Sequence, residues 1–189
     1  MQQTLSLVSG ILFVLGFFPY ILGILKKTAV PSKASWIIWA ALDVITIYSM
    51  WLENCINGQI VGAVIGAMIV AILSLSYGKS GWTTLDKVCI CGAIAGIAIM
   101  MFNPQAALLV SLFTMILGAL PTFSDAWCTP EKMGKAAWIV WLFSCWCAMC
   151  SIPHWTIEDA AQPITFLFNN SVMIYLVFVR PHLGKSTRT

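Results

Sequence analysis

Charged residues are scarce in this chain: Asp, Glu, Lys and Arg together make up 9% of its 189 residues, whereas hydrophobic residues make up 60%. A soluble domain carries about 25% charged residues, so the composition excludes an ordinary soluble protein. The long apolar runs predict an all-α membrane protein, because a helix satisfies its own backbone hydrogen bonds in lipid. The length suits a single transmembrane domain over residues 1–189, with the lipid bilayer as its surroundings.

Motifs for catalysis and metal binding are also missing. The chain has two histidines, and it shows no nucleophile–base pair, metal-ligand motif or phosphate-binding loop. Cys145 and Cys147 in "CWCAMC" point about 200° apart on a helix, so they cannot share one metal ion. We therefore expect no enzyme, no cofactor or metal, and no nucleic-acid partner.

The N-terminus "MQQTLSLVSG" has neither a basic region nor a small-residue cleavage site, which predicts a retained helix instead of a signal peptide. The hydrophobic runs predict seven membrane spans. The expected ranges are 4–25, 35–52, 57–78, 86–102, 104–125, 136–152 and 162–180, with Pro153 and Pro163 bracketing a loop before the last one.

Basic residues all fall on one side of this seven-span arrangement. They lie between spans one and two, three and four, and five and six, and in the tail at 181–189 together with Arg180. Glu53, Glu158 and Asp159 lie on the other side. The positive-inside rule then predicts an external N-terminus and a cytoplasmic C-terminus, in a bacterial inner membrane or its equivalent.

Two segments 102 residues apart in the sequence share the same pattern. Pro19, Trp36 and Trp39 in the first correspond to Pro121, Trp138 and Trp141 in the second. Such a match predicts an internal repeat. Repeat one covers about 4–78 and repeat two about 104–180, with 86–102 as a linker helix. Because four crossings separate matched spans, the two three-helix repeats are expected to be parallel.

This 3+1+3 arrangement, with a proline in the first helix of each triplet, resembles the SWEET (MtN3/saliva) and PQ-loop transporters over nearly the whole chain. The PQ dipeptide is only partly matched, as Pro19-Tyr20 and Pro121-Thr122. The resemblance implies alternating access to a substrate site between the repeats. It also implies that Pro19 and Pro121 act as hinges at the cytoplasmic gate, although static kinks would give the same sequence. Asp125, four residues after Pro121, is a candidate gate residue or a simple interfacial charge.

Trp39, Trp141 and Asp43 are candidate substrate-binding residues. The tryptophans would clamp a ring-shaped ligand, or else belong to an interfacial aromatic belt with Trp36 and Trp138. Asp43 lies four residues after Trp39, on the same helix face and about 10 Å into the helix. A carboxylate there costs about 2.5–3.5 kcal/mol to insert, which favours proton coupling or substrate binding over a packing role.

Asn169 and Asn170 interrupt the last span, and at least one is expected to contact substrate unless they only join helices. In SWEET transporters an asparagine of this helix pairs with one in the third helix, but here the third span has none at mid-depth.

We therefore predict a carrier for a small polar metabolite, a sugar or an amino acid, with proton coupling through Asp43. One alternative is a vitamin or nucleoside carrier like the nicotinamide riboside transporters, although their WNxxW signature is absent. A non-transporting receptor of related fold is another. Assembly into a homo-oligomer is left open.

Overall fold

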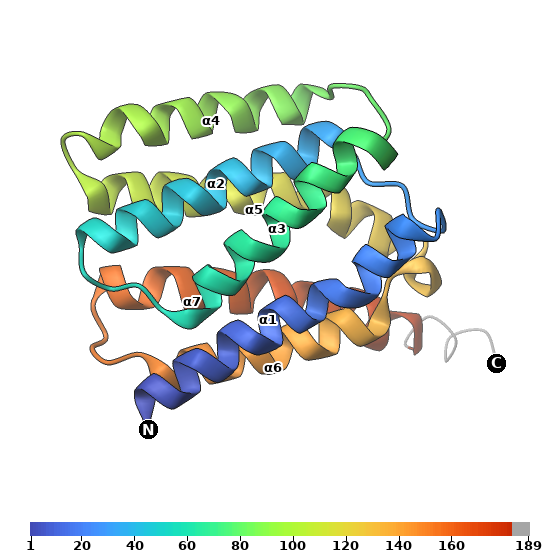
Figure 1. The fold of residues 1–189 in the computed structure, drawn as a ribbon. Coiled ribbons are helices and arrows are strands. Elements are labelled where there is room, and N and C mark those ends of the chain that lie inside the picture. The colour runs from blue at the N-terminus through green and yellow to red at the C-terminus, as the bar shows by residue number, and fades with distance from the viewer. Residues whose placement is uncertain (183–189) are drawn as a thin grey trace.

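The computed structural model describes residues 1–182, apart from the side chain of residue 132. Over this range the chain forms seven α-helices and no strand (Figure 1). The helices are α1 (Gln2–Leu25), α2 (Lys33–Leu52), α3 (Gly58–Tyr77), α4 (Thr84–Met100), α5 (Pro104–Cys128), α6 (Lys135–Ser151) and α7 (Ile157–Ile174), with a 3₁₀ turn η1 (Pro130–Lys132) and a π-helical turn η2 (Tyr175–Val179).

Polar side chains begin most of these helices by binding backbone N–H groups that have no partner within the helix. Ser32, Asn57, Asn103 and Thr156 each accept such a bond at the start of α2, α3, α5 and α7. Thr83 begins α4 with a capping box, in which it and Asp86 bond each other's backbone N–H. These caps explain why loops of only a few residues separate long apolar helices.

Five helices are long and apolar enough to cross a membrane: α1, α2, α3, α5 and α7 extended through η2 to His182. By length and composition, they indicate an integral membrane protein. The other two, α4 and α6, have 17 residues each. At 1.5 Å per residue, they are roughly 25 Å long, near the lower limit for spanning.

Successive helices run in opposite directions, so the loops alternate between two ends of the bundle (Figure 1). We call one the basic end and the other the acidic end. The basic end holds loops 26–32, 78–83 and 129–134, and the acidic end holds loops 53–57, 101–103 and 152–156. The acidic-end loops contain no Lys or Arg, and Glu53, Glu158 and Asp159 lie there. Lys185 and Arg188 of the tail lie outside the described residues.

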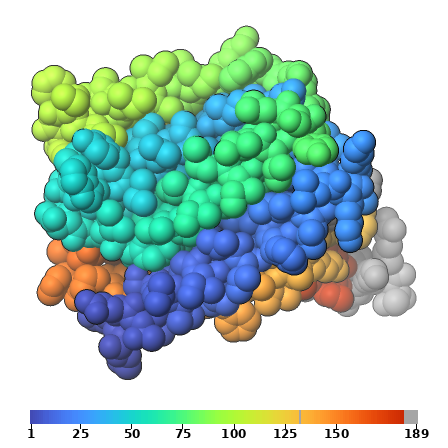
Figure 2. All heavy atoms as spheres, viewed as in Figure 1, coloured from blue at the N-terminus to red at the C-terminus, as the bar shows by residue number. Residues whose placement is uncertain are grey.

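Helix α3 packs against both α1 and α2, and α7 likewise packs against both α5 and α6. These two groups meet mainly through α1 with α6 and α2 with α5, with smaller contacts of α3 with α6 and of α2 with α7. Helix α4 packs against α5 and α2, at one edge of the bundle (Figures 1 and 2). This packing leaves the centre of the molecule to α1, α2, α3, α5, α6 and α7.

Glycines bring α1 and α3 into backbone contact, as the Gly58, Gly62 and Gly66 spacing predicts. A Cβ on Gly58 would lie 2.0 Å from the Ser6 carbonyl oxygen, and one on Gly62 would lie 2.5 Å from the Gly10 carbonyl oxygen. A Cβ on Gly66 would lie 2.0 Å from the Phe17 ring. The ridge therefore sets the close approach of α3 to α1 and makes room for an aromatic side chain.

The predicted start of the last helix is wrong. Helix α7 begins at Ile157 instead of residue 162, so Pro163 lies inside the helix and not in a loop. The reason is local: the Thr156 hydroxyl accepts a bond from the Asp159 N–H, and two acidic residues in the first turn suit the positive end of the helix dipole. The proline, near the helix start, removes only one backbone bond.

We predict that the basic end faces the cytoplasm. In a cysteine-free background, Ser80→Cys at the basic end should react with a membrane-impermeant maleimide only after the membrane is opened. Phe102→Cys, 91% exposed at the acidic end, should react in intact cells. Labelling of both positions from the same side would contradict the alternating arrangement, and reversed labelling would contradict the orientation.

Candidate functional site

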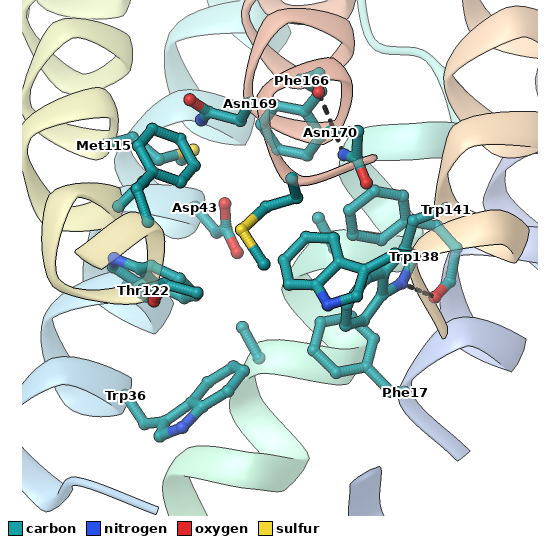
Figure 3. Close-up of a pocket in the computed structure, with 17 residues that line it drawn as sticks. Phe17, Trp36, Asp43, Met115, Thr122, Trp138, Trp141, Phe166, Asn169 and Asn170 are labelled. Carbon is teal, nitrogen blue, oxygen red and sulfur yellow. Dashed lines mark hydrogen bonds between the residues drawn. The ribbon is translucent and has the colours of Figure 1, made fainter. Parts of the chain in front are cut away.

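A central cavity lies between the helices, with a volume of about 100 Å³. Six helices line it, and in several cases the residues come from corresponding positions of the two groups. The lining comprises Phe13, Phe17, Trp36, Trp39, Asp43, Ala63, Ala67, Met115, Ala119, Thr122, Phe123, Trp138, Trp141, Phe166, Asn169, Asn170 and Met173 (Figure 3). All five residues predicted to bind substrate are in this set, as are Trp36 and Trp138.

The two tryptophan pairs have the same geometry. The rings of Trp36 and Trp39 are 5.3 Å apart at 74°, and those of Trp138 and Trp141 are 5.0 Å apart at 73°. Such edge-to-face contacts suit the charge distribution of aromatic rings. Figure 3 shows Trp36 on one side of the cavity and Trp138 and Trp141 on the other. The cavity therefore presents aromatic surfaces from both α2 and α6.

Glycines hold the inner tryptophan of each pair. The Trp141 indole lies over Gly16 of α1, where an added Cβ would be 2.2 Å from its nitrogen, and it donates a hydrogen bond of 2.9 Å to the Phe13 carbonyl. The Trp39 indole lies over Gly118 of α5, where an added Cβ would be 2.7 Å from its nitrogen. Gly16 and Gly118 are also 102 residues apart. The Trp39 nitrogen has no hydrogen-bond partner among the described residues.

Asp43 is near the middle of α2 and points into the cavity from its wall (Figure 3). Its side chain is 6% exposed. Among the described side chains and backbone of residues 1–182, the carboxylate has no hydrogen-bond donor and no cation as partner. A buried carboxylate without a partner is costly, so its position favours a role with a ligand or a proton. At the matching position on α6, Cys145 instead bonds to Gln59.

Asn169 and Asn170 lie on α7 beside the cavity. The Asn170 amide donates to the Phe166 carbonyl at 3.0 Å, while its own oxygen has no partner among the described residues. The Asn169 oxygen is also without a described partner. Both side chains thus offer unused acceptors.

The predicted hinge and gate residues lie away from the cavity lining. Pro19 is inside α1 and Pro121 inside α5, and both are exposed on the outside of the bundle. Each proline leaves the carbonyl four residues earlier, Leu15 or Leu117, without its helical bond. Asp125 is exposed near the basic end, and its carbonyl accepts bonds from Thr129.

A chain of buried hydrogen bonds closes the cavity toward the acidic end. Asn57 donates to Gln162 at 2.7 Å, and Gln162 donates to Gln59 at 3.1 Å. Gln59 donates to Ser144, which donates to the Ser9 carbonyl at 2.7 Å. These residues, which we call the polar layer, join α1, α3, α6 and α7. Gln59 and Gln162 each lie four residues, or about 6 Å, outward from a lining residue of the same helix.

A wider vestibule lies on the other side of this polar layer, with a volume of about 480 Å³. Its lining includes Gln2, Cys55, Asn57, Ser151 and Asp159. Burial raises the pKa of the Cys55 thiol to about 12, and the negative charges of the nearby Asp159, Glu53 and Glu158 add to this increase. The vestibule therefore has a negative field, and the polar layer separates it from the central cavity.

Sequence reasoning missed the apolar half of the lining and the polar layer. Phe13, Phe17 and Phe166 look like ordinary membrane-helix residues, so no signal distinguishes them. Gln59 offered a weak signal, because it is the only amide side chain of the apolar helix α3. Gln162 did not stand out, because α7 carries several other polar residues.

Comparisons with protein-family models, curated proteins and solved structures found no match for this chain.

Proposed function

We propose that the protein is a membrane carrier, not an enzyme, which moves a small polar metabolite by alternating access. The observation that carries this proposal is the central cavity, which has an unpaired carboxylate and is closed by a polar layer on one side. A receptor would need a recognition surface outside the membrane, and the loops of this chain are short.

Corresponding positions support an arrangement of two parallel three-helix repeats like that of the SWEET and PQ-loop transporters. Trp36 and Trp138, Trp39 and Trp141, and Gly16 and Gly118 are each 102 residues apart and have matching surroundings. The helix contacts match too, since α1–α6 corresponds to α5–α2. On this proposal, α1–α3 and α5–α7 are the repeats, α4 is the linker, and the substrate binds at their interface.

Alternating access then requires the polar layer to open while the basic end closes. The layer connects α1 and α3 with α6 and α7, so rocking of the two repeats would break the Gln59–Gln162 bond. We propose that Asp43 carries a proton during this cycle, because a carboxylate held in an apolar interior is stable only when it is neutral or paired.

Reconstitution into liposomes tests the carrier function. Vesicles with the protein should exchange an internal labelled substrate for an external one, and protein-free vesicles should not. Substrates come from a panel of amines, sugars, amino acids and vitamins. Binding without exchange for every compound that binds would leave a receptor and overturn the carrier.

We expect the prolines to affect the rate of exchange and not the affinity. Pro19→Ala and Pro121→Ala each restore a backbone donor and straighten the helix, so either change should slow exchange several-fold. Ligand affinity should stay within about twofold, because neither proline lines the cavity. Pro104→Ala is the control, since a proline at the first position of α5 bends nothing. Unchanged exchange in the Pro19/Pro121 double variant would reduce these prolines to passive kinks.

A further inference from the structure

We propose that the ligand of the central cavity is a small organic cation bearing N–H groups, such as an alkylammonium or guanidinium compound. This inference deepens the proposed function by naming the substrate class, and it rests on that function for its biological meaning. Its chemical content comes from the cavity lining.

Charge is the first argument. Among the described residues that line the cavity, Asp43 alone has an ionisable acid or base. Its carboxylate is buried and has no partner in the described part of the chain. A ligand cation would supply the missing partner, and in an apolar cavity this attraction is much stronger than in water. An amino-acid ligand would instead bring a second carboxylate that no lining side chain could pair.

Aromatic rings are the second argument. Trp36 and Trp138 are on different sides of the space into which Asp43 points, and Trp141 lies beside Trp138 (Figure 3). A cation close to the face of an indole is attracted to its negative π-system, most strongly where water is excluded. A carboxylate within a group of tryptophans is therefore chemically suited to an organic cation.

The hydrogen-bond inventory is the third argument, because three N–H donors of the lining are used within the protein while two amide oxygens, in addition to the Asp43 carboxylate, have no described partner. The Trp39 indole nitrogen is a lining donor that also has no described partner. The Trp141, Trp36 and Asn170 N–H groups donate to Phe13, Tyr20 and Phe166. The oxygens of Asn169 and Asn170 have no described partner. Free acceptors call for a ligand that donates, which a protonated amine or guanidinium does and a quaternary ammonium does not.

Cavity size limits the ligand. A cavity of about 150 Å³ holds benzene, which has six non-hydrogen atoms, so about 100 Å³ suits roughly four or five. Methylguanidinium meets this limit, and N-methylurea has nearly the same shape without the charge.

The acidic vestibule is consistent with a cationic ligand. Asp159 lines it, and Glu53 and Glu158 lie close enough to act on Cys55. The negative charge of these acidic residues raises the local concentration of cations near the polar layer that closes the cavity.

The test measures equilibrium binding to the full chain in lipid nanodiscs by calorimetry, with methylguanidinium and N-methylurea as probes. The wild type should bind methylguanidinium at least ~10-fold more tightly than N-methylurea. Asp43→Asn should abolish this difference, because the amide has similar shape and no charge. Glu131→Gln makes the same chemical change at an exposed loop position and should keep it.

Equal affinity of the wild type for both probes would overturn the inference, as would methylguanidinium binding that survives in a folded Asp43→Asn variant. The wild-type comparison decides the question even if that variant fails to fold. Binding with no exchange of methylguanidinium in liposomes would leave this inference standing and count against the carrier. Exchange of a sugar by a protein that does not bind methylguanidinium would support the carrier and overturn this inference.

Discussion

Asp43→Asn is expected to abolish accumulation of substrate driven by a pH gradient. The amide keeps the size of the carboxyl group but can neither release a proton nor balance a cation. The wild type should concentrate labelled substrate in liposomes when a pH gradient is imposed, whereas the variant should reach only the level of protein-free vesicles. Glu131→Gln should accumulate substrate like the wild type.

Exchange between equal internal and external pools of substrate distinguishes the two proposed roles of Asp43, which are to carry a proton and to bind the organic cation. If Asp43 carried only the proton, exchange would survive in Asp43→Asn, because no net proton movement is needed. We expect exchange to be lost as well, since the organic cation also needs the charge. Asp43→Glu should retain partial uptake with a shifted pH optimum. Gradient-driven accumulation by Asp43→Asn at the wild-type rate would contradict the hypothesis that Asp43 carries the proton.

The polar and aromatic part of this site could be predicted from the sequence because lipid makes such residues expensive. An aspartate in the middle of an apolar run, or two asparagines in a span, needs a reason that a leucine does not. The internal repeat, and not the cost of burial in lipid, identified Trp39 and Trp141, since they recur at one offset with Asp43 one turn away from the first. The structure places all of these side chains around one cavity.

The rest of the site follows from three-dimensional packing that the sequence does not express. Phe17 reaches the cavity because Gly66 leaves room for its ring. The glycine spacing predicts a close helix contact, but it does not show which side chain occupies the space. The Gln59–Gln162 bond joins helices more than 100 residues apart in sequence, so neither residue signals the other. The predicted start of α7 was too late because the apolar run shows only which residues can lie in lipid. The helix itself begins earlier, where the Thr156 side chain caps it.

Gly16→Ala is expected to have the second large effect, because it removes the space that Trp141 occupies. The new methyl group would lie 2.2 Å from the indole nitrogen, far inside van der Waals contact. The indole must move, and its hydrogen bond to the Phe13 carbonyl must break. Overpacking costs about 1–3 kcal/mol and a lost hydrogen bond about 1 kcal/mol, so we expect destabilisation by about 2–4 kcal/mol.

Thermal unfolding in detergent measures this effect, and methylguanidinium binding should weaken at least ~10-fold, because Trp141 lines the cavity. Gly118→Ala should cost less, since its methyl group would lie 2.7 Å from a Trp39 nitrogen that has no described partner to lose. Gly96→Ala is the matched control: its methyl group meets Ile45 at an ordinary 3.5 Å, so the higher helix propensity of alanine should leave the protein as stable or more stable.

A double-variant cycle identifies the indole as the cause. In a Trp141→Ala background the obstruction is gone, so Gly16→Ala should no longer destabilise the protein and should gain up to about 1 kcal/mol from helix propensity. If Gly16→Ala were equally costly in both backgrounds, the glycine would be serving some other contact of α1. If it were harmless in the wild type, Trp141 would be free to move, and the cavity wall built from α1 and α6 would not depend on this close approach.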